Sequence, residues 1–108
     1  MKFGLAHTGN TLIVRIAGEL DHHYTDEIRI RIDSEIMKPY VQNVVFDFNK
    51  LTFMDSSGIG MIVGRYKKIK AVGGNIYIMC GNKTVKKILE MSGVFQFAKI
   101  CDDINDAV

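Results

Sequence analysis

The chain has 108 residues, the usual size of one domain, and 47% of them are hydrophobic. That apolar content is enough for a core and excludes an intrinsically disordered chain. The formal net charge of +2 is far below the strongly basic balance of a nucleic-acid-binding protein. We therefore expect a single domain spanning residues 1–108 that does not bind nucleic acid.

The sequence also lacks the marks of a secreted or membrane protein. Its first residues do not form the apolar stretch of a signal peptide, and no run approaches the ~20 apolar residues of a membrane-spanning helix. Cys80 and Cys101 are the only cysteines, and a cytosolic chain keeps such residues as thiols. We expect a cytoplasmic protein that makes no membrane contact and holds no metal.

The first part of the chain predicts a β-hairpin. Residues 2–6 and 11–17 have the apolar and β-branched residues of strands, and Gly9-Asn10 between them is typical of a tight turn. In the second strand Leu12, Val14 and Ile16 share one face. Arg15 lies mid-strand on the other face.

Residues 21–38 could form either a helix or a strand. Apolar and basic residues alternate from Ile28 to Ile32, as in a strand, yet a large apolar residue also recurs every fourth position: Tyr24, Ile28, Ile32 and Ile36. The segment is long for a strand, Asp21 suits a helix N-cap, and Pro39 supplies a stop. We predict a helix.

Strands and helices alternate after Pro39. We predict strands at residues 44–48, 76–80 and 98–100, helices at residues 57–72 and 82–91, and a terminal helical turn at residues 102–107. This order predicts an α/β fold with a mixed, mostly parallel sheet of about five strands. Arg15 and Asp47 occupy mid-strand positions where a doubly covered sheet would carry apolar residues. We therefore expect helices mainly on one face, with Arg15 and Asp47 able to pair on the other.

The helix predicted at residues 57–72 carries its own packing signals. Gly60 and Gly64 lie four residues apart, which predicts a close approach of the helix to the elements beneath it, and Gly73-Gly74 ends it. Its buried stripe is predicted to comprise Ile59, Ile62, Val63, Tyr66 and Ile69.

Motifs for hydrolysis and nucleotide binding are incomplete. Neither Ser56 nor Ser57 has glycines two residues away on both sides, so the nucleophile elbow is missing. Gly81-Asn-Lys-Thr84 resembles the end of a P-loop, but Asn82 stands where that motif has glycine before the lysine. A polar helix cap beside an exposed Lys83 is the plainer interpretation, and nucleotide binding or weak NTPase activity is the alternative.

The adjacent His22 and His23 do not form a metal-binding pair. Successive residues of a helix diverge by about 100°, whereas helical metal ligands usually stand three or four residues apart. We expect these histidines to be exposed in the first helical turn and available to a partner.

The most informative segment is Asp55-Ser56-Ser57-Gly58, which follows a hydrophobic strand and opens a helix. One residue is sufficient to cap a helix, so three polar residues in a row indicate a further role. Free N–H groups at a helix N-terminus favour negative charge, so a phosphate on either serine would be tolerated there. Met54, placed in the preceding loop, could face a partner. The residues alone leave open whether the segment is a cap or a phosphorylation switch, and which serine is modified.

These residues resemble the STAS domain family, specifically the anti-sigma factor antagonists of sporulating and related Gram-positive bacteria. The resemblance covers nearly the whole chain and is strongest with the sporulation branch. It implies the STAS α/β sheet and a regulatory protein that is not an enzyme. The segments that carry it are Gly18-Glu-Leu-Asp-His-His23, Phe53-Met-Asp-Ser-Ser-Gly-Ile-Gly60, Gly64-Arg-Tyr-Lys-Lys-Ile-Lys70 and Met91-Ser-Gly93.

The resemblance also implies a mechanism. The unphosphorylated chain would bind an anti-sigma factor that is also a serine kinase, and so release a sigma factor. The kinase would inactivate the chain by phosphorylating Ser57, and a serine phosphatase would reverse this. ATP and magnesium would belong to the kinase, so the chain itself, a monomer when free, would need no cofactor. The expected partner-binding residues are Asp21, His22, His23, Met54, Asp55, Ser56, Gly58 and Ile59.

Overall fold

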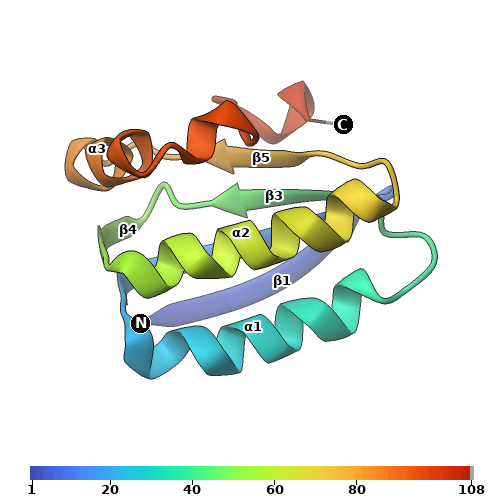
Figure 1. The fold of residues 1–108 in the computed structure, drawn as a ribbon, viewed down its shortest axis with the longest axis horizontal. Helices are drawn as coiled ribbons and strands as arrows, with labels where there is room; N and C mark the ends of the chain where they lie inside the picture. Colours follow the sequence, from blue (N-terminus) through green and yellow to red (C-terminus); the bar gives the residue numbers. More distant parts are fainter. Residues whose placement is uncertain (108) are drawn as a thin grey trace.

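In the computed structural model, which describes residues 1–107, a mixed sheet of six strands is covered by three α-helices (Figure 1). The strands are β1 (Lys2–Thr8), β2 (Thr11–Leu20), β3 (Asn43–Asp47), β4 (Leu51–Met54), β5 (Ile76–Met79) and β6 (Lys99–Ile100). The helices are α1 (His22–Ile36), α2 (Ser56–Ala71) and α3 (Lys83–Ser92), with 3₁₀ turns at Val94–Gln96 and Ile104–Asp106. The predicted fold class is confirmed.

The sheet is built around β2. The strand order is β1-β2-β3-β5-β6, in which β1 is antiparallel to β2 and the other pairs are parallel. The first half of β2 pairs with β3 and its last residues pair with β4, with a register shift between Gly18 and Glu19. β4 was not predicted, because residues 51–54 were expected to form a loop.

The main core lies between the sheet and the helices. Ile28 and Ile32 of α1 are 1% and 0% exposed and pack with strand residues such as Val14 and Phe46. Tyr24, predicted to share this stripe, is instead 40% exposed, and Thr25 is buried in the first turn.

The opposite face of the sheet is only partly covered. A smaller cluster there consists of Ile13, Val45, Met79, Cys101 and Ala107, so the C-terminal segment covers part of this face. Arg15 and Asp47 stand opposite each other in register, with Arg15 Nε 3.3 Å from Asp47 Oδ2. The predicted pair and the uneven covering of the sheet are both confirmed.

The packing of α2 differs from the prediction. Gly60 and Gly64 have no atoms within 4 Å of the position that a Cβ would occupy. The close approach occurs at Gly58, where a Cβ would lie 2.7 Å from Met54 Cγ and 3.3 Å from Leu20 Cδ2. The residues of α2 that are buried are Gly58, Met61, Ile62, Arg65 and Ile69.

Among the residues described, no helix combines the length and the apolar character required to cross a membrane.

Candidate functional site at the starts of two helices

The site forms where two adjacent parallel strands end. Leu20 of β2 pairs with Met54 of β4, so Asp21 and Asp55 follow neighbouring strand ends. The backbone N–H of Asp55 donates to the carbonyl of Leu20 over 3.2 Å, which continues the pairing by one residue. As a result α1 and α2 begin next to each other at one end of the molecule (Figure 1).

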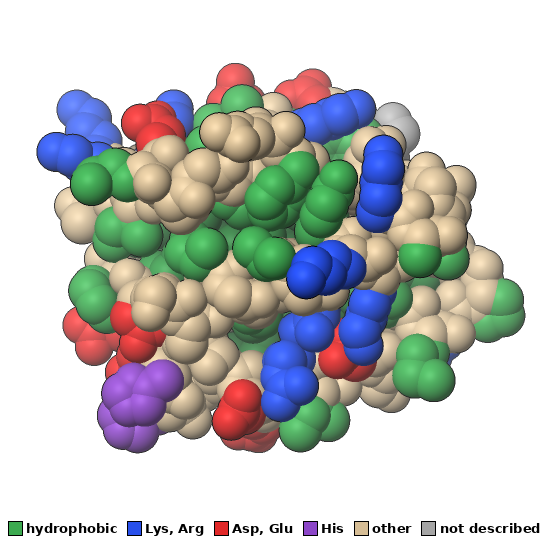
Figure 2. Space-filling model, in the orientation of Figure 1, with side chains coloured by type: hydrophobic (Ala, Val, Ile, Leu, Met, Phe, Trp, Pro, Cys, Tyr) green, Lys and Arg blue, Asp and Glu red, His purple; other side chains and the backbone are tan. Residues whose placement is uncertain are grey.

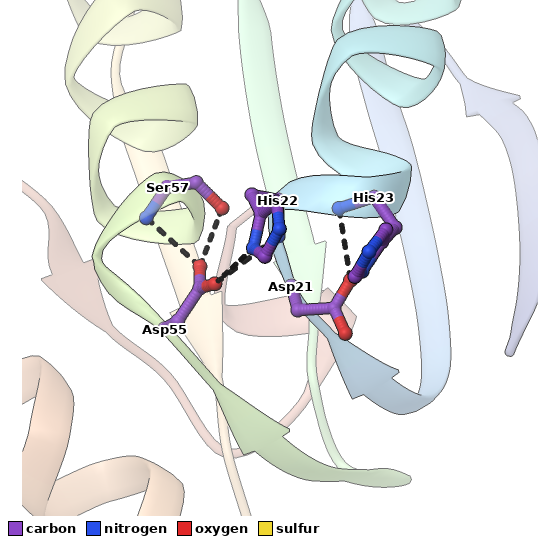
Figure 3. A network of polar contacts seen from close by, with 5 residues as sticks. All are labelled: Asp21, His22, His23, Asp55 and Ser57. Carbon is purple, nitrogen blue, oxygen red and sulfur yellow. Dashed lines mark hydrogen bonds and ion pairs between the residues drawn. The ribbon is translucent and has the colours of Figure 1, made fainter.

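Asp55 is the centre of the hydrogen-bond network (Figure 3). Its Oδ1 accepts hydrogen bonds from the Ser57 hydroxyl and, over 2.9 Å, from the Ser57 backbone N–H. Its Oδ2 accepts from the backbone N–H of His22 over 3.1 Å and lies 3.4 Å from the His22 ring Nδ1. The carboxylate therefore caps α2 and also holds the start of α1.

These donors stabilise the charged form of Asp55. The hydrogen bond from the Ser57 hydroxyl is the largest cause that lowers the pKa of Asp55, and the backbone N–H groups of Ser57 and His22 add to it. Partial burial acts in the opposite direction and is outweighed. Asp55 is thus a carboxylate at neutral pH.

Asp21 caps the neighbouring helix. It accepts a hydrogen bond from the backbone N–H of His23 over 2.9 Å and lies 3.2 Å from the His23 ring Nδ1. The His22 and His23 rings lie 4.2 Å apart between centroids, and their side chains are 71% and 70% exposed. Figure 2 shows histidine side chains protruding beside acidic ones at this end of the molecule.

The structure places most of the predicted contact residues at this surface. Ser56 is exposed, whereas Asp21, Asp55, Ser57 and Ile59 are half-buried. Within residues 1–107, no three His, Cys, Asp or Glu side chains are grouped so that they could hold a metal ion.

Met54 and Gly58 do not lie on this surface. Met54 is 1% exposed and belongs to the core, and Gly58, in the first turn of α2, is buried against it. Met54 was placed in a loop, but it belongs to β4, where successive side chains point to opposite faces. Its neighbour Phe53 is the residue that is 42% exposed beside the site.

The family model of the STAS domain matches residues 3–107. The chain belongs to the STAS domain family. It is 40% identical over 103 residues to the anti-sigma F factor antagonist of Paenibacillus polymyxa, covering 95% of this chain and 88% of that protein.

Solved structures of related STAS domains have the same fold. The anti-sigma factor antagonist SpoIIAA in its unphosphorylated form superposes with a TM-score of 0.78 at 33% identity, covering 94% of this chain and 89% of that chain. The Bacillus cell fate determinant SpoIIAA in the phosphorylated form gives a TM-score of 0.77 at 32% identity, covering 97% and 96% of the two chains.

A hollow beside Ser57 was not predicted for this STAS domain. It lies between α1 and α2, has a volume of about 210 Å³, and is lined by Thr25, Asp26, Arg29, Ser57, Gly60 and Met61. Thr25 and Arg29 stand one turn apart in α1, a spacing that places them on one face of the helix. The predicted stripe of this helix comprised Tyr24, Ile28, Ile32 and Ile36, so Arg29 was not identified.

The P-loop-like segment of this STAS domain folds as a helix cap. Asn82 is the N-cap of α3, and its side chain accepts a hydrogen bond from the Val85 backbone N–H over 3.0 Å. Lys83 is the first residue of the helix and is exposed. This is the polar helix cap beside an exposed lysine that was predicted as the plainer interpretation of the segment.

Proposed function

We propose that this chain is an anti-sigma factor antagonist, which in its unphosphorylated form binds an anti-sigma factor and so frees a sigma factor. The observation that carries the proposal is the Asp55-Ser56-Ser57 segment, presented at the joint start of two helices. It occurs in a chain that is 40% identical, over 95% of its length, to an anti-sigma F factor antagonist. The chain acts by binding and is not itself an enzyme.

The switch is phosphorylation of Ser57 by an anti-sigma factor that is also a serine kinase, and a serine phosphatase reverses it. Transfer of the γ-phosphoryl group of ATP forms a bond between Ser57 Oγ and phosphorus, breaks the bond to ADP and releases the hydroxyl proton. ATP and magnesium are bound by the kinase, so this chain needs no cofactor. The choice of Ser57 comes from the family resemblance. Exposure alone would favour Ser56, which is the more exposed of the two serines.

Electrostatics explains why the modified chain would release its partner. A phosphate adds about −1.5 to −2 charges at neutral pH. It would join the carboxylates of Asp21 and Asp55 on a surface that binds the partner while Ser57 is neutral. A partner pocket shaped for a hydroxyl would then meet extra bulk and uncompensated charge, which can lower the affinity by about a hundredfold without refolding.

Two substitutions at position 57 test this function. Ser57→Ala should keep the affinity for the anti-sigma factor and take up no phosphate, because only the modified hydroxyl is lost. Ser57→Asp should bind about a hundredfold more weakly, since it places a permanent negative charge at the same point. Isothermal titration calorimetry with the purified anti-sigma factor measures both affinities.

Ser56→Ala is the matched control. It removes the neighbouring hydroxyl and should leave both phosphate uptake and partner affinity unchanged. Mass spectrometry of the chain after incubation with the kinase and ATP locates the modified serine. Equal affinities of Ser57→Ala and Ser57→Asp, or phosphate found on Ser56, would contradict the proposed switch.

A further inference from the structure

Phosphorylation would end the contact between the Ser57 side chain and Asp55. The Ser57 hydroxyl now donates to Asp55 Oδ1, whereas a phosphorylated Oγ has no hydrogen to donate. The phosphate and the Asp55 carboxylate also carry like charges and repel each other. Rotation about χ1 moves the group between staggered positions, so it can leave Asp55 while the backbone of α2 stays in place.

The hollow between α1 and α2 lies directly beside Ser57 and offers a cation. Ser57 and Arg29 both line this space of about 210 Å³, which exceeds the roughly 30 Å³ of a single water several times over. Thr25, whose side chain carries a hydroxyl group, also lines the hollow. A phosphate leaving Asp55 would therefore find beside it a space whose lining includes the cation of Arg29, although the carboxylate of Asp26 lines it too.

Arg29 is held only weakly in the unphosphorylated chain. Its Nη2 lies 3.4 Å from Asp26 Oδ1, and the two side chains are 46% and 84% exposed. Exposed ion pairs of this kind contribute little to the stability of a protein. A phosphate offers three acceptor oxygens and up to twice the charge of a carboxylate, so it is the stronger partner for a guanidinium.

The seam between α1 and α2 has an excess of positive charge. Behind the hollow Asp33 is shared by two cations: Arg65 Nε lies 2.8 Å from its Oδ1, and Lys68 Nζ lies 3.2 Å from its Oδ2. Burial is the largest cause that lowers the pKa of Arg65, and repulsion from Arg29 adds to it. Figure 2 shows Lys and Arg side chains gathered over this seam. Arg65 and Lys68 thus outnumber Asp33 behind the hollow, whereas the hollow itself is lined by one cation, Arg29, and one carboxylate, Asp26.

We propose that in the phosphorylated chain the Ser57 phosphate lies in the hollow between α1 and α2, and that Arg29 exchanges Asp26 for this phosphate. The inference rests on the proposed phosphorylation of Ser57. Arg29 is a positioning residue: it holds the phosphate against the domain. The same residues would then determine where the new charge is presented to a partner.

The test uses the full chain with phosphoserine installed at position 57 during synthesis, so that no kinase is needed. Phosphorus-31 NMR follows the second ionisation of the phosphate as the pH is varied. A nearby guanidinium stabilises the dianion, so Arg29→Gln should raise the phosphate pKa by about 0.5 unit. Asp26→Asn should lower it, because a competing and repelling carboxylate is removed. Asp55 contacts Ser57, and the His22 ring contacts Asp55; both residues are unchanged in every variant.

Arg31→Gln is the matched control. It removes the same charge from the same helix, but Arg31 stacks over the Phe3 ring, 4.9 Å from its centroid, and does not line the hollow. Arg31→Gln should leave the phosphate pKa unchanged. Arg29→Lys keeps a positive charge, so it should raise the phosphate pKa less than Arg29→Gln does. Equal phosphate pKa values in Arg29→Gln and Arg31→Gln would overturn the proposal. Failure of the proposed function would show differently, as phosphate on another residue or as equal partner affinities of the Ser57 variants.

Discussion

At the scale of single residues, the site depends on the Asp55 carboxylate. One oxygen accepts from the backbone and side chain of Ser57, and the other accepts from the backbone of His22. Asp55 therefore fixes the start of α2, orients the hydroxyl of the candidate phosphorylation site, and holds the first turn of α1. A residue that only capped a helix would have fewer partners.

Asp55 should make the stability of the chain depend on pH. Its pKa is lower in the folded chain than in the unfolded chain. The stabilisation is therefore fully present above the unfolded pKa and is lost as the pH falls through the folded pKa. At pH 7 Asp55→Asn should lower the free energy of unfolding by about 1 kcal/mol. Urea unfolding should show this difference shrinking below about pH 4.

The control is Asp26→Asn, which removes the same charge from a side chain that is 84% exposed. It separates the effect of net charge from the effect of the hydrogen bonds at Asp55. A difference between wild type and Asp55→Asn that stays constant from pH 7 to about pH 3 would show that ionised Asp55 is not the stabilising species.

Sequence patterns identified most residues of this surface but not which of them are buried. Asp21 was predicted as a helix cap, and the segment that begins at Asp55 as a cap or a phosphorylation switch, because each follows a strand and precedes a helix. Met54 was expected to face a partner from a loop, but strand pairing buries it and leaves its neighbour Phe53 exposed. Arg29 gains its position only when α1 and α2 pack together, and no local pattern records that contact.

At the scale of elements, α2 depends on one glycine and tolerates change at another. Gly58→Ala should destabilise the chain by about 1 kcal/mol or more, because the new methyl group would lie 2.7 Å from Met54 Cγ. Gly60→Ala should stabilise it by up to about 1 kcal/mol, since nothing lies within 4 Å and alanine is the better helix former. Urea unfolding of the two variants measures both values. If Gly58→Ala were also stabilising, the tight contact between α2 and β4 would be disproved.

The helices were predictable because each has an N-cap, a period of apolar residues and a stop. The longer strands were predictable from their apolar residues. Asp21, Asp55 and Asn82 are the N-caps of α1, α2 and α3, and each accepts a backbone N–H in the way that its residue type favours. β4 escaped prediction because it has four residues and no apolar alternation. It becomes a strand because β2 extends beyond the end of β3 and offers free pairing groups.

At the scale of the whole molecule, the two faces of the sheet differ. The helix face carries the main core, and the other face carries a small cluster together with the Arg15–Asp47 pair. This asymmetry was predictable, because charged residues in the middle of strands are incompatible with a face that is fully buried. The contribution of the C-terminal segment was not predictable, since a short polar turn with few apolar residues has no strong pattern.

The C-terminal segment should contribute measurably to stability. Ala107 is 9% exposed within the cluster on the open face. Ala107→Asp would bury a carboxylate there and should lower the free energy of unfolding by about 2 kcal/mol. Asn105→Asp adds the same charge at an exposed position of the same turn and should change stability by less than about 0.5 kcal/mol. Thermal unfolding followed by circular dichroism compares them, and equal melting temperatures would show that the segment does not cover the sheet.

The shared carboxylate between the two helix starts has a consequence for how this sequence can diverge. One backbone donor to Asp55, His22, lies 33 positions away along the chain, and the other, Ser57, lies two positions away. Any replacement at position 55 must therefore suit both segments at once. Drift in one of these turns is constrained by the other, although they are remote along the chain. We therefore expect substitutions in the two turns to be coupled in their effects rather than independent.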